Sequence, residues 1–127
     1  MSDIAYYHNF VTSLVFTIVV ETCVIFAILK GFLRNREVSS KRLLFAGIFV
    51  NFATVPYVWF IIPGVMSTSS ANALIISEPV VFVIEAIFYW FVLEVDLKTA
   101  LLLSLVANAT SYFLGPLLRD AGLWIYW

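Results

Sequence analysis

Residues 71–93 read ANALIISEPVVFVIEAIFYWFVL, and this stretch decides the fold class. A helix rises about 1.5 Å per residue and the hydrocarbon layer of a membrane is about 30 Å thick, so about 20 mostly apolar residues cross it. The stretch is long enough, and its only charged residues are Glu78 and Glu85. It therefore predicts a transmembrane helix.

Three further stretches of the same kind lie near residues 9–33, 43–64 and 99–118. The connections between them are short, which predicts antiparallel neighbours. None of the stretches alternates polar and apolar residues at a period of two, as a membrane barrel requires. The sequence therefore predicts an all-α membrane protein, an antiparallel four-transmembrane-helix bundle that forms a single transmembrane domain over residues 1–127. Gly115-Pro116 is expected to close the last helix.

The composition excludes several classes of protein. Hydrophobic residues make up 63% of the chain and charged residues 12%, whereas a soluble domain is about half apolar and about a quarter charged. The net charge of −1 provides no basic field for nucleic acid. The chain has one cysteine and one histidine, and no hydroxyl has a general base nearby in sequence. We therefore expect no enzyme activity, no cofactor and no metal.

Basic residues gather around the first turn and predict the orientation of the chain. Short loops rich in Lys and Arg stay in the cytoplasm, so both termini of this multi-pass membrane protein are expected on the non-cytoplasmic side. The cluster could also bind anionic lipid head groups, each charge contributing about 1 kcal/mol near the surface. Its members are Lys30, Arg34, Arg36, Lys41 and Arg42.

Each predicted helix carries one strongly polar residue near the middle of the membrane. In chain order these are Glu21, Asn51, Glu85 and Asn108. Glu78 lies about two helical turns from Glu85 on the same face. Lipid offers such groups no hydrogen-bond partners, so we expect them to point into the bundle.

These polar residues have a structural and a functional interpretation. Asn and Ser in membrane helices commonly join neighbouring helices, with an average contribution of about 0.6 kcal/mol. A glutamate inside the membrane indicates a functional site by default, although a neutral one bonded to an Asn would be structural. The functional interpretation predicts an ion or proton site formed by Glu21, Glu78, Glu85, Asn51, Asn108, Ser104 and Ser111.

The two hairpins resemble each other, which predicts an internal duplication. Both halves would cross the membrane in the same sense, related by an axis along the membrane normal. Two carboxyl groups flanking that axis cannot both ionise, so they would share one proton or cation. The aligned pairs are Glu21 and Glu85, Leu29 and Leu93, Lys41 and Lys98, Gly47 and Ser104, Asn51 and Asn108, and Thr54 and Ser111.

Two functions remain open. Small size and the absence of a catalytic set modestly favour a non-catalytic subunit or interaction partner of a membrane complex, surrounded by lipid and by other subunits or copies of itself. The polar residues at mid-depth favour the alternative, a proton- or cation-coupled transporter or channel that uses the intramembrane glutamates.

Overall fold

The structure is a computed structural model that describes residues 3–66 and 70–123. These residues form helices and no strand. The elements in chain order are α1 (Asp3–Phe26), the π-helix η1 (Ala27–Phe32), α2 (Ser40–Pro56), the π-helix η2 (Tyr57–Ile61), α3 (Ile62–Met66), α4 (Ser70–Leu93) and α5 (Leu97–Asp120).

Four helical segments are long and apolar enough to cross a membrane. They are Asp3–Phe32, Ser40–Val65, Ile75–Leu93 and Leu97–Asp120. This confirms an all-helical chain with four candidate membrane spans. The first helix begins at Asp3, before the predicted start near residue 9, because Asp3 and the tyrosines after it continue the helix that the apolar residues favour.

The expectation that Gly115-Pro116 closes the last helix is wrong. Helix α5 continues through both residues to Asp120. A membrane helix tolerates the loss of the one backbone N–H that proline lacks. Gly122, two residues after the end of the helix, supplies the stop, because only glycine readily adopts its φ of 71°. The N–H of Gly122 donates to the carbonyl of Arg119 and the N–H of Leu123 donates to that of Leu118, which is the Schellman arrangement.

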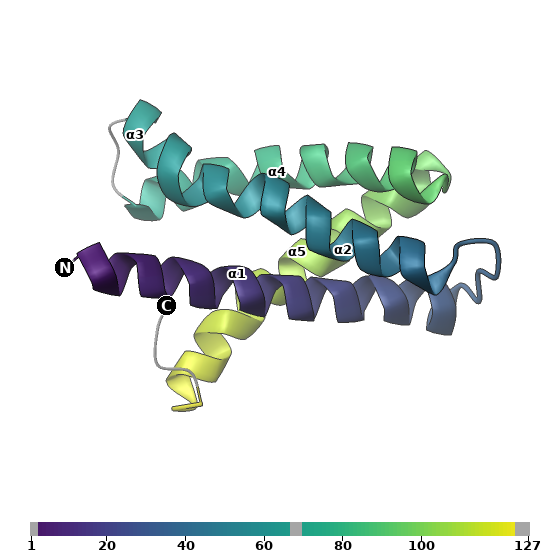
Figure 1. Cartoon of the computed structure of the whole chain (residues 1–127), viewed down its shortest axis with the longest axis horizontal. Helices are drawn as coiled ribbons and strands as arrows, with labels where there is room; N and C mark the ends of the chain where they lie inside the picture. Colours follow the sequence, from purple (N-terminus) through teal and green to yellow (C-terminus); the bar gives the residue numbers. More distant parts are fainter. Residues whose placement is uncertain (1–2, 67–69, 124–127) are drawn as a thin grey trace.

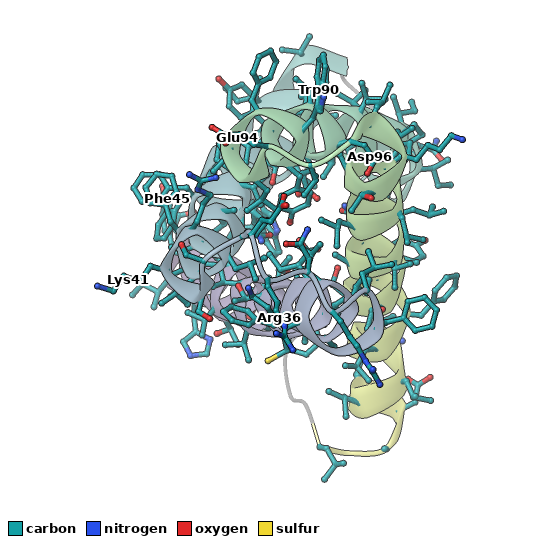
Figure 2. The ribbon with its side chains drawn as sticks, turned by 90° about the vertical axis from the view of Figure 1, so that its right-hand side faces the viewer. Arg36, Lys41, Phe45, Trp90, Glu94 and Asp96 are labelled. Atoms are coloured by element: carbon teal, nitrogen blue, oxygen red, sulfur yellow. The ribbon has the colours of Figure 1, made fainter. Side chains whose placement is uncertain are left out.

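The helices pack in two pairs that also contact each other (Figure 1). Helix α1 packs on α2 and α5, and α4 packs on α5 and α2. Helices α1, α2 and α4 run side by side, while α5 crosses them obliquely. Figure 2 looks at the end where both hairpins turn, with Arg36 and Lys41 beside one connection and Glu94 and Asp96 beside the other.

Gly47 allows α1 and α2 to pack at close range. A Cβ atom built on Gly47 would overlap the Oγ1 of Thr22 and lie 3.0 Å from its Cβ. Such contacts are shorter than side chains tolerate, so only glycine permits this approach.

A mainly apolar core fills the space between the helices at the end where the hairpins turn. Its buried members include Ile25 from α1, Leu29 from η1, Leu43 from α2, Leu93 from α4 and Leu103 from α5. This core lies directly next to the buried polar residues along each helix. It therefore separates them from the water at that end of the molecule.

Candidate functional site

Glu21 is a buried carboxyl held between three helices. Its side chain is 1% exposed on α1. Its Oε1 accepts a hydrogen bond of 2.7 Å from the Oγ of Ser111 on α5, and its Oε2 accepts one of 3.1 Å from the Nδ2 of Asn51 on α2. Both carboxyl oxygens are thus satisfied by uncharged donors.

Glu85 occupies the corresponding place on α4 and is also 1% exposed. Its Oε1 accepts a hydrogen bond of 3.1 Å from the Oγ1 of Thr54 on α2, and its Oε2 accepts one from the Nδ2 of Asn108 on α5. The turn of α2 that donates to Glu21 through Asn51 also donates to Glu85 through Thr54. The two carboxyl groups therefore belong to one site.

Six side chains from the four helices make these four hydrogen bonds in two sets of three, and we call the whole arrangement the carboxyl ring. One turn of α2 supplies an amide and a hydroxyl, and one turn of α5 supplies the same two groups. Each asparagine donates to the glutamate of its own hairpin, and each hydroxyl donates to the glutamate of the other hairpin. The ring consists of Glu21, Asn51, Thr54, Glu85, Asn108 and Ser111.

No cation of the described residues pairs with the ring. The ion pairs in residues 3–66 and 70–123 join Arg42 to Glu94 at 3.4 Å and Arg119 to Asp120 at 3.1 Å, both on the surface. The same residues contain no group of three or more His, Cys, Asp or Glu side chains placed to hold a metal ion. The described residues therefore provide the ring with no ion-paired counter-charge.

Each ring hydroxyl has a choice of two acceptors. The Oγ1 of Thr54 lies 2.9 Å from the carbonyl oxygen of Val50 as well as 3.1 Å from Glu85. The Oγ of Ser111 lies 3.1 Å from the carbonyl oxygen of Asn108 as well as 2.7 Å from Glu21. A hydroxyl carries one proton, so it donates to the carboxyl or to the backbone, but not to both.

Backbone contacts fix the orientation of the two amides. The Nδ2 of Asn51 also donates to the carbonyl of Gly47, and the Nδ2 of Asn108 donates to the carbonyl of Ser104, both at 2.9 Å. The hydroxyl of Ser104 donates to the carbonyl of Phe82 at 2.8 Å and ties α5 to α4. Ser104 therefore supports the ring from outside.

The structure brings together most, but not all, of the predicted site residues. Glu21, Glu85, Asn51, Asn108 and Ser111 all lie in the ring. Glu78 does not belong to the ring. It lines a separate groove between α4 and α5.

Thr54 and Tyr89 were not among the predicted site residues. Thr54 donates to Glu85, and its spacing of three from Asn51 was the available signal. Tyr89 is fully buried one turn from Glu85, and its hydroxyl has no hydrogen-bond partner among the described residues. Other buried polar atoms without such a partner are the Oγ of Ser13, the Oγ1 of Thr22 and the Oδ1 of Asn51.

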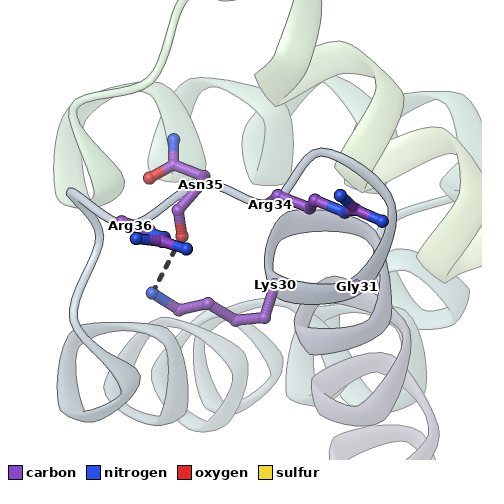
Figure 3. A pocket seen from close by; sticks show the side chains of 5 residues that line it. All are labelled: Lys30, Gly31, Arg34, Asn35 and Arg36. Atoms are coloured by element: carbon purple, nitrogen blue, oxygen red, sulfur yellow. Dashed lines mark hydrogen bonds between the residues drawn. The ribbon is translucent and has the colours of Figure 1, made fainter.

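The basic cluster at the first turn is partly committed to the chain itself. The Nζ of Lys30 donates to the carbonyls of Asn35, at 3.1 Å, and of Val38. Lys30, Arg34 and Arg36 line a cavity of about 520 Å³. In Figure 3 the side chain of Arg36 lies beside that of Lys30, whereas the side chain of Arg34 points away from both. Lipid binding by Lys30, Arg34, Arg36, Lys41 and Arg42 stays a prediction.

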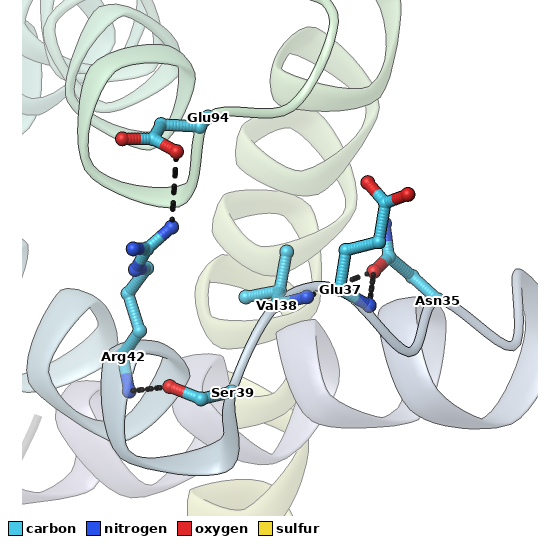
Figure 4. A network of polar contacts seen from close by, with 6 residues as sticks. All are labelled: Asn35, Glu37, Val38, Ser39, Arg42 and Glu94. Atoms are coloured by element: carbon cyan, nitrogen blue, oxygen red, sulfur yellow. Dashed lines mark hydrogen bonds and ion pairs between the residues drawn. The ribbon is translucent and has the colours of Figure 1, made fainter.

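Local hydrogen bonds hold this turn in place (Figure 4). The Oδ1 of Asn35 accepts from the backbone N–H groups of Glu37 and Val38 at 2.9 and 3.0 Å. The Oγ of Ser39 caps α2 by accepting from the N–H of Arg42 at 3.2 Å. The guanidinium of Arg42 reaches Glu94 of the other hairpin, so the two connections are linked.

Comparisons with protein-family models, with curated proteins and with solved structures give no match to this chain.

Proposed function

We propose that this chain is a proton- or cation-coupled membrane transporter and that the carboxyl ring is its ion-binding site. One observation carries the proposal: all four carboxyl oxygens of Glu21 and Glu85 accept hydrogen bonds from uncharged groups on the same turns of α2 and α5. Two adjacent carboxylates in a membrane interior cannot both stay ionised without a counter-charge. The ring must therefore hold at least one proton or cation.

The two hydroxyls let the ring exist with and without a proton. When Glu85 is ionised, the hydroxyl of Thr54 donates to it. When Glu85 carries a proton on Oε1, the carboxyl donates to Thr54, whose own proton turns to the carbonyl of Val50. Ser111 serves Glu21 in the same way through the carbonyl of Asn108. Neither state leaves a donor without an acceptor, as a reversible site requires.

We also propose that the four helices form one antiparallel bundle of two duplicated hairpins. The buried positions support this. Outside the ring, buried residues of the first hairpin correspond to buried residues of the second at a constant separation in sequence. In the first helix of each hairpin the pairs are Ser13 and Ser77, Ile25 and Tyr89, and Leu29 and Leu93. In the turn and the second helix, at a second constant separation, the pairs are Val38 and Val95, Leu43 and Ala100, Ala46 and Leu103, and Val50 and Ala107. If α1 corresponds to α4 and α2 to α5, the contact of α1 with α5 corresponds to the contact of α4 with α2, and both contacts are present.

The proposed orientation places both termini on the non-cytoplasmic side, because the hairpin turns carry the basic residues. A charged, membrane-impermeant thiol reagent tests it in intact cells of a host that expresses the chain. With Cys23 replaced by Ser, the reagent should label His8→Cys and should not label Lys41→Cys until the cells are opened. The opposite pattern would reverse the orientation.

Transport is tested with proteoliposomes that enclose a pH-sensitive dye and start acidic inside. Adding Na⁺ or K⁺ outside should raise the internal pH as the cation exchanges for protons. Glu85→Gln should abolish the exchange, while Glu94→Gln, at the exposed end of α4, should leave it unchanged. Equal signals from wild type, Glu85→Gln and protein-free vesicles would contradict transport of these ions.

A non-catalytic subunit of a membrane complex is the second candidate. The observation that favours it is the sealing of the ring, since Glu21, Glu85 and Asn51 are at most 1% exposed. In that case the ring serves to join α1, α2, α4 and α5 in one arrangement. Purification in mild detergent from its native membrane would then recover the chain with fixed partners at a constant ratio, and Glu85→Gln would change only stability.

A further inference from the structure

A groove on the lipid-facing side of α4 and α5 lies outside the carboxyl ring. Its volume is about 480 Å³, within the range of about 300–1,000 Å³ typical of small-molecule sites. Its lining includes Ile75, Glu78, Phe82, Leu105, Asn108 and Tyr112. The wall is apolar except for a few groups, and these define what the groove can bind.

Glu78 is the charged group of the groove. Neither ion pair of the described residues involves its carboxyl. The amide of Asn108 is committed to Glu85 and Ser104. The next residue, Pro79, has no N–H, so the carbonyl of Ile75 lacks the donor that a regular helix would supply. The groove is thus an apolar wall with one carboxyl group, that of Glu78, which takes part in no ion pair of the described residues.

The aromatic rings of Phe82 and Tyr112 complete this chemistry. A cation held close to an aromatic face is attracted by the negative charge of the ring face. A carboxylate and two aromatic side chains in an apolar wall therefore suit one kind of occupant, an ammonium group attached to an apolar body. A neutral or anionic amphiphile would leave Glu78 without a counter-charge in a largely apolar place.

We propose that this groove binds an amphiphilic organic cation that enters sideways from the lipid, with its ammonium group at Glu78 and its apolar part over Phe82 and Leu105. This proposal names a substrate class for the proposed transport function. The coupling of cation binding to proton release rests on that transport function. The binding step itself does not, because it needs only the groove.

Asn108 connects the groove to the carboxyl ring. One side of this residue lines the groove, and its amide donates to Glu85. Glu78 also lies on the same face of α4 as Glu85, about two helical turns away. A bound cation beside Glu78 therefore favours the ionised state of the ring, and one proton leaves the ring as the cation binds. By reciprocity, proton binding to the ring weakens cation binding.

The titratable groups that face this coupled site come from three helices. They are Glu21 from α1, Glu78, Glu85 and Tyr89 from α4, and Tyr112 from α5. Helix α2 contributes the uncharged Asn51 and Thr54.

Binding is tested in phosphatidylcholine nanodiscs with three amphiphiles that share a twelve-carbon tail. These are dodecyltrimethylammonium, the neutral monoglyceride of lauric acid, and laurate, each corrected for uptake by empty nanodiscs. Only the cation should bind saturably. Glu78→Gln should weaken its binding at least about tenfold, the scale of one lost charged contact, while Glu94→Gln should not change it. Leu105→Trp, which fills the groove, should also weaken it.

Two outcomes would overturn the groove proposal. One is equal binding of the cation and the neutral amphiphile, and the other is no saturable binding of the cation at all, as expected if a partner helix covers this face. Retention of cation binding in Glu78→Gln would equally reject Glu78 as the binding group.

A second measurement separates this proposal from the transport proposal. A pH dye in weakly buffered solution should record proton release when dodecyltrimethylammonium binds to wild-type protein. The double substitution of Glu21→Gln and Glu85→Gln should remove the release while binding persists. Binding without release from wild-type protein would support the groove and contradict its coupling to the ring.

Discussion

The hydroxyl of Ser111 donates a hydrogen bond of 2.7 Å to the carboxyl of Glu21, which lies 90 positions earlier in the chain. This contact joins the last helix to the first. Its counterpart joins the hydroxyl of Thr54 to Glu85. Both contacts run between the hairpins, so the carboxyl ring joins the two halves of the molecule by side-chain hydrogen bonds.

Removing either hydroxyl should weaken the fold by a similar amount. Ser111→Ala and Thr54→Val each delete one hydrogen bond between the hairpins and change little else. Each should lower the free energy of unfolding by about 0.6 kcal/mol, and by at most about 1.7 kcal/mol. Reversible unfolding in mixed detergent measures both. Thr110→Val is the control, because its hydroxyl bonds only to its own helix, at the carbonyl of Val106.

Replacing Glu85 by glutamine should be tolerated in the fold. The carboxamide oxygen of the variant can accept from Asn108, and its NH2 group can donate to Thr54, which then donates to Val50. This is the pattern of a protonated carboxyl. Thermal unfolding of Glu85→Gln should therefore match wild type or exceed it.

Glu85→Leu is the matched contrast for that substitution. It leaves the amide of Asn108 with an unsatisfied donor in the interior, and we expect a loss of about 1–3 kcal/mol. Equal destabilisation by Gln and Leu would show that the ring requires the ionised carboxyl, against the exchange of donors described above.

Sequence alone predicts the membrane class well, because that class depends on length and composition. It also predicts that Glu21, Asn51, Glu85 and Asn108 lie at similar depth, since each helix fixes depth by counting residues. Those four side chains indeed meet in the ring.

Other features needed the tertiary structure. Which hydroxyl reaches which carboxyl depends on the packing of α1 on α5 and of α2 on α4, and helical spacing within one element contains no such information. The end of α5 was missed because Gly115-Pro116 resembles a helix stop, whereas Gly122 supplies the actual one. The groove at Glu78 depends on how two helices diverge, which no residue pattern specifies.

Gly47→Ala should destabilise the contact between α1 and α2. The added methyl group would overlap the side chain of Thr22, and overpacking of this kind costs about 1–3 kcal/mol. Gly31→Ala makes the same chemical change where nothing lies within 4 Å, so it should be neutral or slightly stabilising. Thermal unfolding of both variants measures the difference. Equal stability of the two would show that the helices are free to move apart.

Asp96 should titrate below its usual range in the folded protein. The hydroxyl of Thr99 donates to its carboxylate, and this bond lowers the pKa of Asp96 below the ordinary value of 3.8. A lowered pKa means that the stabilisation is fully present above the unfolded value and is lost as the pH falls through the folded value.

Carboxyl-carbon NMR in micelles measures this titration directly. Thr99→Val removes the donor, and the pKa of Asp96 should return towards 3.8. Because Asp96 is fully exposed at the surface, the substitution should hardly change stability at neutral pH. An unchanged pKa in Thr99→Val would show that the hydroxyl does not hold the carboxylate.

Tyr89→Phe tests the buried hydroxyl beside the ring. The side chain of Tyr89 is fully buried, and its hydroxyl has no hydrogen-bond partner among the described residues. An unsatisfied buried hydroxyl costs about 1–3 kcal/mol, so its removal should raise the free energy of unfolding by up to that amount. Tyr112→Phe, at a side chain that is 41% exposed, should leave stability unchanged. If Tyr89→Phe destabilises the protein instead, the hydroxyl has a partner in the membrane, and a water molecule or ion beside the two carboxyls is the species to look for.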